Sequence, residues 1–174
     1  AVYLLFLSIV LFSSSFGNFF IGDDFTWLRW AADAPEGILR YFTEANGFFY
    51  RPGTKVYFYL MYHTFWLNQI VYHFVSLFLH FAVTVLFFVL AKKVFKNTLL
   101  AAFAAFLFLI MSGSTEAVFW ISSTGHLFNA FFGLLGLLFF IYYEEKKKLY
   151  YYILSFAFFS LALLFHELGI FLPL

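Results

Sequence analysis

Apolar runs separated by short polar breaks dominate the pattern of this chain. A hydrophobic run of about 20 residues is long enough to cross the hydrocarbon core of a bilayer as a helix. The runs to consider are Val2–Phe16, Ile70–Ala91, Leu99–Met111, Leu127–Tyr143 and Leu149–Phe165. The third is short, and a start near Val94 would lengthen it, with Lys96 reaching back to the interface. The pattern predicts an all-α integral membrane protein with about five transmembrane helices.

The segment of residues 17–69, between the first two runs, mixes aromatic, aliphatic and charged side chains at roughly helical spacing. Such mixing is typical of amphipathic helices that lie in the membrane interface. Pro35 and Pro52 divide the segment. The interfacial helices expected from this pattern are Phe25–Ala32, Ile38–Ala45 and Gly53–Leu67.

Composition supports the membrane interpretation. Hydrophobic residues make up 64% and charged residues 11%, and the mean hydropathy is +0.91, which excludes a soluble globular domain of this size. The absence of cysteine excludes disulfides and thiolate metal sites. Because the chain begins at Ala1 without methionine and stops at Leu174 within an apolar run, we expect a fragment that forms one transmembrane domain over 1–174. For Ala1–Phe16 we favour a truncated first span over a signal peptide, because no basic region precedes it.

Charge placement predicts which side of the membrane each loop occupies. Short loops rich in lysine mark the cytoplasmic side, and the two lysine clusters fall on the same side if every run crosses. These clusters are Lys92, Lys93 and Lys96, and Lys146, Lys147 and Lys148. The loop of residues 17–69 is then external, together with every arginine. The acids expected outside are Asp23, Asp24, Asp33, Glu36, Glu44, Glu116 and Glu167.

Polar stripes run along two of the predicted spans. His73, Ser76, His80 and Thr84 follow one another at spacings of three, four and four, so they share a helical face that should point into the bundle. The two histidines lie about 10 Å apart along the axis, so hydrogen bonding between helices is favoured over joint chelation of an ion.

Small residues mark a second stripe, on the fourth predicted span. The residues on this face are His126, Asn129, Gly133 and Gly136. Small side chains let a neighbouring helix approach closely, and Ala101 with Ala105 offers a matching surface on the third span. We interpret the stripe as packing, although His126 and Asn129, at its outer end, also suit the edge of a site.

Acidic residues recur at the outer ends of the spans. Asp23 and Asp24 follow Gly22, Glu116 follows a Ser/Gly/Thr turn, and Glu167 ends the fifth span. Each alone is explained by helix capping, because a carboxylate is favourable at a helix N-terminus. Their convergence on one face, together with an Arg-Pro pair and interface aromatics, is more than capping requires.

The order of these motifs resembles a known family. The motifs are Asp23-Asp24, Phe48-Phe49-Tyr50-Arg51-Pro52, Tyr72-His73, Leu79-His80, Glu116-Ala117-Val118-Phe119-Trp120-Ile121-Ser122 and His166-Glu167-Leu168-Gly169-Ile170-Phe171-Leu172-Pro173. In this succession the chain resembles the N-terminal half of a GT-C-type membrane glycosyltransferase, nearest the protein O-mannosyltransferase relatives and their bacterial homologues. The family pattern often has Arg or Lys where His126 and His166 stand.

The resemblance implies a function. Such enzymes transfer a sugar from a polyprenyl-phosphate carrier to a protein or glycan acceptor on the extracytoplasmic side, which here implies a bacterial plasma membrane with an outward-facing site and no nucleic-acid partner. A divalent metal is compatible with the family but not required.

The resemblance also implies residue roles. Asp23 or Asp24, with Asp23 favoured, would be the catalytic base or a metal-linked acceptor organiser. Glu116 would be a second acidic site residue, and Arg51 would bind the carrier phosphate. The remaining substrate-binding candidates are His73, His126 and Glu167.

Two other classes of protein stay open at this stage. A transporter or flippase needs ionisable groups or broken helices near the bilayer midplane, usually in repeated halves. His80 is the strongly ionisable candidate at that depth, and no internal repeat is visible. A non-catalytic membrane scaffold would not need a clustered acidic face.

Overall fold

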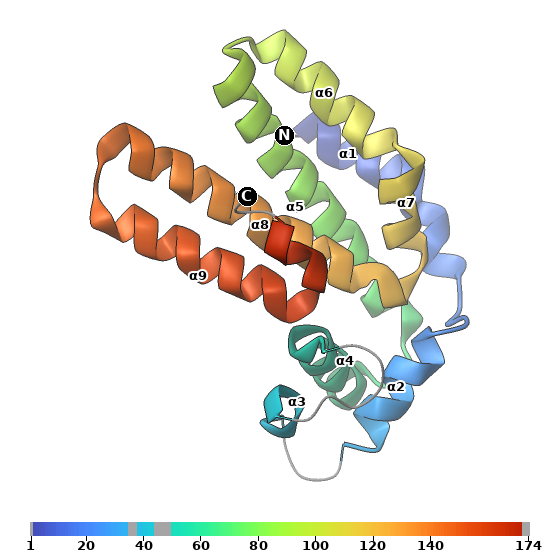
Figure 1. Ribbon diagram of the computed structural model, residues 1–174. Coiled ribbons are helices and arrows are strands. Elements are labelled where there is room, and N and C mark those ends of the chain that lie inside the picture. The colour runs from blue at the N-terminus through green and yellow to red at the C-terminus, as the bar shows by residue number, and fades with distance from the viewer. Residues whose placement is uncertain (1, 35–37, 44–49, 172–174) are drawn as a thin grey trace.

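The structure, a computed structural model, describes residues 2–34, 38–43 and 50–171. These residues form helices and turns, with no β-strand among them (Figure 1), so the predicted all-α fold is confirmed. The apolar helices are α1 (Val2–Phe12), α5 (Gln69–Phe95), α6 (Thr98–Ile110), α8 (Thr124–Lys146) and α9 (Leu149–Phe165). The other elements are α2 (Asp24–Ala32), α3 (Arg40–Thr43), α4 (Pro52–Phe65), α7 (Ser112–Phe119) and the 3-10 turns η1 (Ser13–Gly17), η2 (Ile121–Ser123) and η3 (Glu167–Phe171).

Each apolar run expected to span the membrane forms a helix. By length and hydropathy, two helical stretches of the described chain qualify as spans, namely α5 with 27 residues and Ile121–Lys146 with 26. At 1.5 Å per residue, the 13 residues of α6 reach about 20 Å, which is less than the thickness of a bilayer core of about 30 Å. The α1 and α9 helices are also shorter than a full span.

The junction between α5 and α6 lies after Phe95, and not near Val94 as the alternative start of the third run would place it. The α5 helix continues to Phe95, and Lys96 ends it in the left-handed conformation, with φ 53° and ψ 20°. The side chain of Asn97 then caps α6 by accepting hydrogen bonds from the backbone N–H groups of Leu99 and Leu100 at 2.9 and 3.2 Å. The alternative start near Val94 is therefore wrong.

The helices predicted for residues 17–69 are confirmed in part. The α2 and α4 helices correspond to the predicted stretches Phe25–Ala32 and Gly53–Leu67, whereas α3 covers only the middle of Ile38–Ala45. Several residues singled out in the sequence lie outside the described residues: Pro35, Glu36, Glu44, Ala45, Phe48, Phe49, Leu172 and Pro173.

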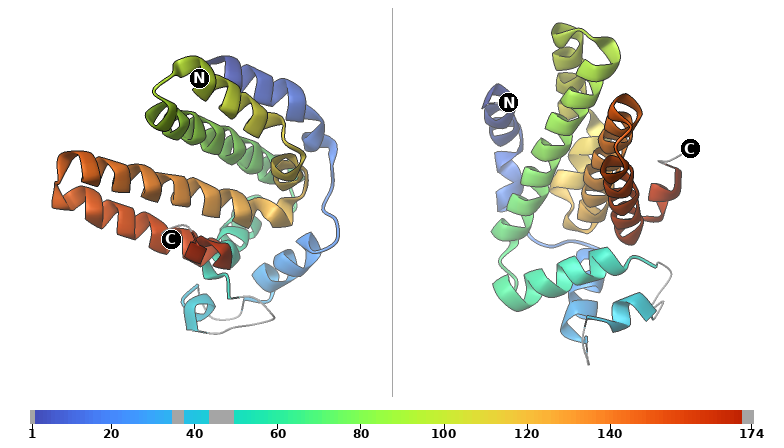
Figure 2. Two further views of the ribbon diagram at one scale, coloured as in Figure 1. Left: turned by 45° about the horizontal axis from the view of Figure 1, so that its top comes forward. Right: turned by 90° about the vertical axis from the view of Figure 1, so that its left-hand side faces the viewer.

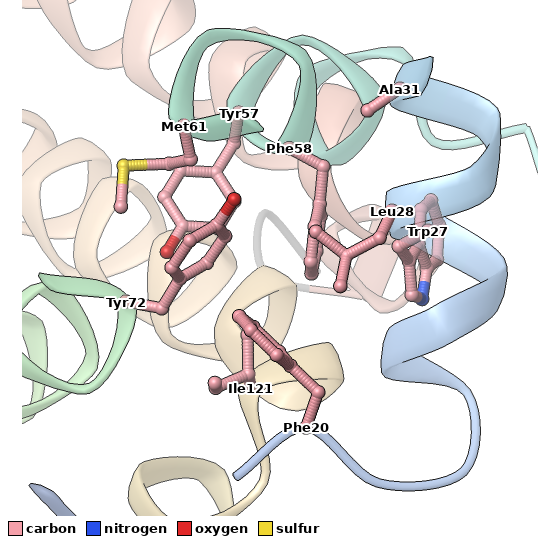
Figure 3. Packing of buried hydrophobic residues seen from close by; sticks show 9 residues of the cluster. All are labelled: Phe20, Trp27, Leu28, Ala31, Tyr57, Phe58, Met61, Tyr72 and Ile121. Atoms are coloured by element: carbon pink, nitrogen blue, oxygen red, sulfur yellow. The ribbon is translucent and has the colours of Figure 1, made fainter. Parts of the chain in front are cut away.

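An aromatic core joins α4 to the ends of the longer helices, so α4 is more deeply packed than an interfacial helix. Phe58 is fully buried and stacks on Trp27 of α2 with ring centroids 5.6 Å apart. Figure 3 shows Phe58 between α2 and the tyrosine pair formed by Tyr57 of α4 and Tyr72 of α5. The cluster comprises Phe20, Trp27, Leu28, Ala31, Tyr57, Phe58, Met61, Tyr72 and Ile121. Burial of this much aromatic surface fixes α2 and α4 to the bundle.

The polar stripe of α5 faces inward, as predicted. His73, Ser76, His80 and Thr84 are all buried. The Ser76 hydroxyl lies 2.8 Å from the Thr124 hydroxyl of α8, and His80 Nε2 lies 3.2 Å from the carbonyl oxygen of Leu109 on α6. The stripe thus hydrogen-bonds α5 to its neighbours.

The glycine stripe of α8 packs against a different helix from the one expected. A Cβ atom added to Gly136 would lie 2.9 Å from the ring of Phe159 on α9, and the Ser155 hydroxyl donates to the Gly136 carbonyl oxygen at 2.9 Å. The main partner of α8 is therefore α9, while α6, with Ala101 and Ala105, packs mainly against α5. The expected match between Ala101/Ala105 and α8 is wrong, because the short α8–α9 turn makes those two helices neighbours.

The bundle has two chemically distinct ends. Lys93 of α5 forms an ion pair with Glu145 of α8 at 2.7 Å, so the two lysine clusters share one end. In the right-hand view of Figure 2, α4 lies across the opposite ends of α5 and α9. The α2 and α4 helices pack on each other there, and this opposite end carries the predicted site residues.

Candidate functional site

The adjacent aspartates of the first loop have different environments. Gly22, at φ 51°, makes the turn before them. Asp24 is 1% exposed, and its carboxylate accepts hydrogen bonds from the Ile21 N–H at 2.9 Å, the Ser122 N–H at 2.6 Å and the Ser122 hydroxyl. Asp23 is exposed and makes no side-chain cap to α2. Asp24 therefore fastens the start of α2 to the turn before α8, while Asp23 remains open to solvent.

Arg51 and Glu167 form a bidentate ion pair between segments 116 residues apart. Arg51 precedes Pro52, the first residue of α4, and Glu167 opens η3. The guanidinium donates from Nε to Oε2 at 2.8 Å and from Nη2 to Oε1 at 2.6 Å. These hydrogen bonds hold the pKa of the Glu167 carboxyl at about 2, well below its ordinary value. The Arg51 side chain is 14% exposed and that of Glu167 is 53% exposed.

Two tilted histidine rings lie against each other beside this ion pair. The His126 and His166 rings have centroids 4.1 Å apart and planes at 35°. The Leu168 N–H donates to His166 Nδ1 at 3.1 Å, so that nitrogen is an acceptor. Burial, and then the neighbouring His126, lower the pKa of His166 to about 4. His166 is thus neutral near pH 7, and its 3.8 Å contact with the Glu167 carboxylate is not an ion pair at that pH.

An open pocket of about 300 Å³ lies where α7, η2 and α8 meet. Its lining residues are Gly113, Glu116, Ala117, Trp120, Ser123 and His126. Glu116 is exposed there, so the pocket presents a carboxylate, a hydroxyl and an imidazole beside an indole. A larger hollow of about 420 Å³ on α2 is lined by Phe25, Thr26, Arg29, Trp30 and Asp33, none of them a predicted site residue.

The pocket, the histidine pair and the ion pair form one connected chain of side chains. His126 lines the pocket with Glu116 and lies against His166, which borders Glu167 and hence Arg51. The His126 ring interacts electrostatically with the charges of Arg51, Glu167 and Glu116. The structure therefore brings Glu116, Arg51, His126 and Glu167 together, and Asp24 joins them through Ser122, which precedes the pocket residue Ser123.

His73 does not belong to this group. It is 1% exposed, and its two ring nitrogens lie 3.2 Å from the carbonyl oxygens of Val118 and Asn18. Backbone partners thus occupy both nitrogens. His73 links α5 to the end of α7 and to the turn after η1, and it is closed to a substrate in this conformation.

Several residues that shape the site end of the bundle were not identified as site residues from the sequence. Ser122 supplies two hydrogen bonds to Asp24. Thr54 donates to the Phe165 carbonyl oxygen at 2.9 Å, and a Cβ on Gly125 would lie 2.7 Å from the Thr54 hydroxyl. Lys55 is buried, with its ammonium 5.4 Å from the Trp30 ring centroid. The small residues at the start of α4 were the available signal that α8 and α9 approach it closely.

No group of three or more histidine, aspartate and glutamate side chains suited to a metal ion occurs in the part of the chain that the structure describes. No protein-family model, curated protein or solved structure matches the chain.

The histidine pair predicts a stability profile with pH. His166 has a pKa of about 4 in the fold and an ordinary value of 6.5, so the unfolded chain binds more protons between these values. Stability is therefore complete above about pH 6.5 and falls as the pH drops toward 4. Glu167, at about 2 against 4.5, extends the loss below pH 4.5.

Thermal unfolding followed by circular dichroism at pH 4–8 measures this profile. We expect His166→Asn, whose side-chain oxygen can still accept from the Leu168 N–H, to reduce the slope between pH 6.5 and 4 and to leave the loss below pH 4 in place. An unchanged slope in that variant would contradict the assignment.

Proposed function

We propose that the chain is a multi-pass membrane protein with about five spans, with its lysine clusters on the cytoplasmic side and the site outside. Large apolar side chains on the helix surfaces support this placement, for example Leu99 and Phe103 of α6, at 78% and 58% exposure. An apolar surface of this extent needs a lipid or protein partner. Two further observations support this placement: two helical stretches are long and apolar enough to span a membrane, and the Lys93–Glu145 ion pair places both lysine clusters at one end of the bundle.

We further propose that the site transfers a sugar from a polyprenyl-phosphate donor to a protein or glycan acceptor. The observation that carries this proposal is a pocket lined by Glu116 and His126 that is linked, through the His126–His166 contact, to the Arg51–Glu167 ion pair. All of these residues lie at the end of the bundle opposite the lysines. A lipid-linked donor requires a site at the membrane edge. In the proposed placement, the carboxylates and the guanidinium of this site lie at that edge. The ordered resemblance to GT-C glycosyltransferases adds to this argument.

The chemistry is a single displacement at the anomeric carbon of the donor. The acceptor oxygen forms a bond to this carbon while the bond from the carbon to the phosphate oxygen breaks. The acceptor proton passes to a carboxylate, for which the exposed Asp23 and Glu116 are the candidates. Asp24, held by three donors, is a positioning residue that fixes the turn before α8.

Arg51 would stabilise the phosphate that leaves on the carrier lipid. Its guanidinium has the planar geometry that binds two oxygens of a phosphate. In the structure the Nε and Nη2 groups of Arg51 donate to Glu167, so a phosphate that used these same groups would have to displace the carboxylate or bind beside it.

Transfer from a radiolabelled polyprenyl-phosphate sugar, with the intact protein in proteoliposomes, tests the proposal. We expect Asp23→Asn to lower turnover by about 100-fold, which is the scale of a lost general base, with the thermal midpoint unchanged because Asp23 is exposed. Asp33→Asn is the matched control, since Asp33 is also an exposed acid at an end of α2, paired with Arg29.

The outcomes of this assay separate two errors. Full activity of the Asp23→Asn variant would show that Asp23 is not the catalytic base. Absence of transfer by the wild-type protein with every polyprenyl-phosphate sugar would overturn the enzymatic proposal.

A further inference from the structure

The end of the bundle opposite the site carries an excess of positive charge. We define the lysine face as Lys92, Lys93, Lys96, Lys146, Lys147 and Lys148. Two acids lie with it: Glu145 pairs with Lys93 at 2.7 Å and Glu144 pairs with Lys147 at 2.5 Å. Six lysines against two glutamates leave a net charge of +4.

Two of these lysines occupy a backbone conformation that disfavours them. Lys96 and Lys147 end α5 and α8 in the left-handed region, at φ 53° and 52°, where glycine is the preferred residue. A lysine near a helix C-terminus interacts favourably with the helix dipole, but the last turns of α5 and α8 already contain Lys92, Lys93 and Lys146. Lys147 pairs with Glu144 of its own helix, and both lysines add positive charge at this end of the bundle in spite of the left-handed backbone.

Tyrosines surround the lysines. Lys93 lies 4.3 Å from the Tyr142 ring centroid, Lys146 lies 5.3 Å from that of Tyr151, and Lys147 lies 5.6 Å from that of Tyr143. Mixed lysine and tyrosine side chains are typical of the membrane–water boundary, where an apolar body meets a polar tip.

We propose that the lysine face binds the headgroups of anionic phospholipids. The phosphates would lie against Lys96 and Lys147, and the acyl chains would lie on the apolar surface that begins beside them. Leu99, in the first turn of α6, and Leu149, the first residue of α9, are 78% and 67% exposed. A partner that carries an anionic phosphate headgroup close to long acyl chains fits this surface, whereas a nucleic acid or an acidic protein segment would leave the leucines uncovered. The inference rests on the proposed membrane placement and is independent of sugar transfer.

Lipid binding by the intact protein in detergent tests the inference, with dioleoylphosphatidylglycerol and dioleoylphosphatidylcholine as probes in native mass spectrometry. We expect selective retention of phosphatidylglycerol. The double variant K96G/K147G should bind it roughly 30-fold more weakly, since each charge near the surface contributes about fivefold. Its thermal midpoint in phosphatidylcholine should be equal or higher, because glycine relieves the left-handed strain.

Two further variants complete the design. K96R/K147R keeps both charges and should retain phosphatidylglycerol. R29Q/R40Q removes the same charge from α2 and α3, at the site end, and should leave lipid binding unchanged. Equal binding of the two lipids, wild-type affinity in K96G/K147G, or equally tight binding of glycerol phosphate without acyl chains would overturn the inference. A protein that retains phosphatidylglycerol selectively but fails to transfer sugar would refute only the proposed function.

Discussion

Asp24→Ala is expected to lower the free energy of unfolding by roughly 3–5 kcal/mol, which is a large effect for one side chain. The carboxylate accepts hydrogen bonds from the N–H groups of Ile21 and Ser122 and from the Ser122 hydroxyl. Alanine would leave both N–H groups without their acceptor next to a buried aromatic core. Thermal or chemical unfolding in detergent micelles, followed by circular dichroism, measures the loss.

Comparison with a substitution at the neighbouring Asp23 shows whether the lost hydrogen bonds cause the loss of stability. Asp23→Ala changes an exposed residue of the same type and should alter stability by less than about 0.5 kcal/mol. Ser122→Ala removes the hydroxyl but keeps the N–H, and should cost about 1 kcal/mol. Equal stability of the two aspartate variants would show that Asp24 does not hold α2 to the turn before α8.

The helices could be predicted from the sequence because long apolar runs determine them locally. The predicted run Leu149–Phe165 coincides with α9, and the inward stripe of α5 followed from the helical period. The boundaries were less accurate. The α5 and α8 helices extend to Phe95 and Lys146, because charged side chains can continue a helix beyond its apolar part, while α8 begins at Thr124 and α1 ends at Phe12.

The partners of the site residues could not be predicted, since they depend on packing between distant segments. Arg51 and Glu167 were expected as separate substrate ligands, yet they bind each other across 116 residues. Neither aspartate differs from the other in local pattern. The hydrogen bonds from Ser122 and from the Ile21 N–H distinguish the buried Asp24 from the exposed Asp23.

Charge reversal at the ion pair is expected to have the largest effect on sugar transfer. Arg51→Glu removes the group proposed to hold the leaving phosphate and places a second carboxylate against Glu167. We expect turnover to fall by about 1000-fold, the scale of a lost donor to developing charge. The loss of stability should be about 2–3 kcal/mol, between the values for an exposed and a buried pair, because the Arg51 side chain is 14% exposed and the Glu167 side chain is 53% exposed. Initial rates in proteoliposomes and thermal midpoints measure the two effects separately.

The exchanged double variant R51E/E167R separates a structural ion pair from a phosphate ligand. It restores opposite charges between the start of α4 and η3, so the thermal midpoint should recover most of the loss. Its guanidinium now projects from η3 rather than from the residue before Pro52, so a phosphate positioned by α4 would still lack its partner, and transfer should remain low. If the exchange restored transfer together with stability, the pair would serve only to join the two segments, and Arg51 would not be the phosphate ligand.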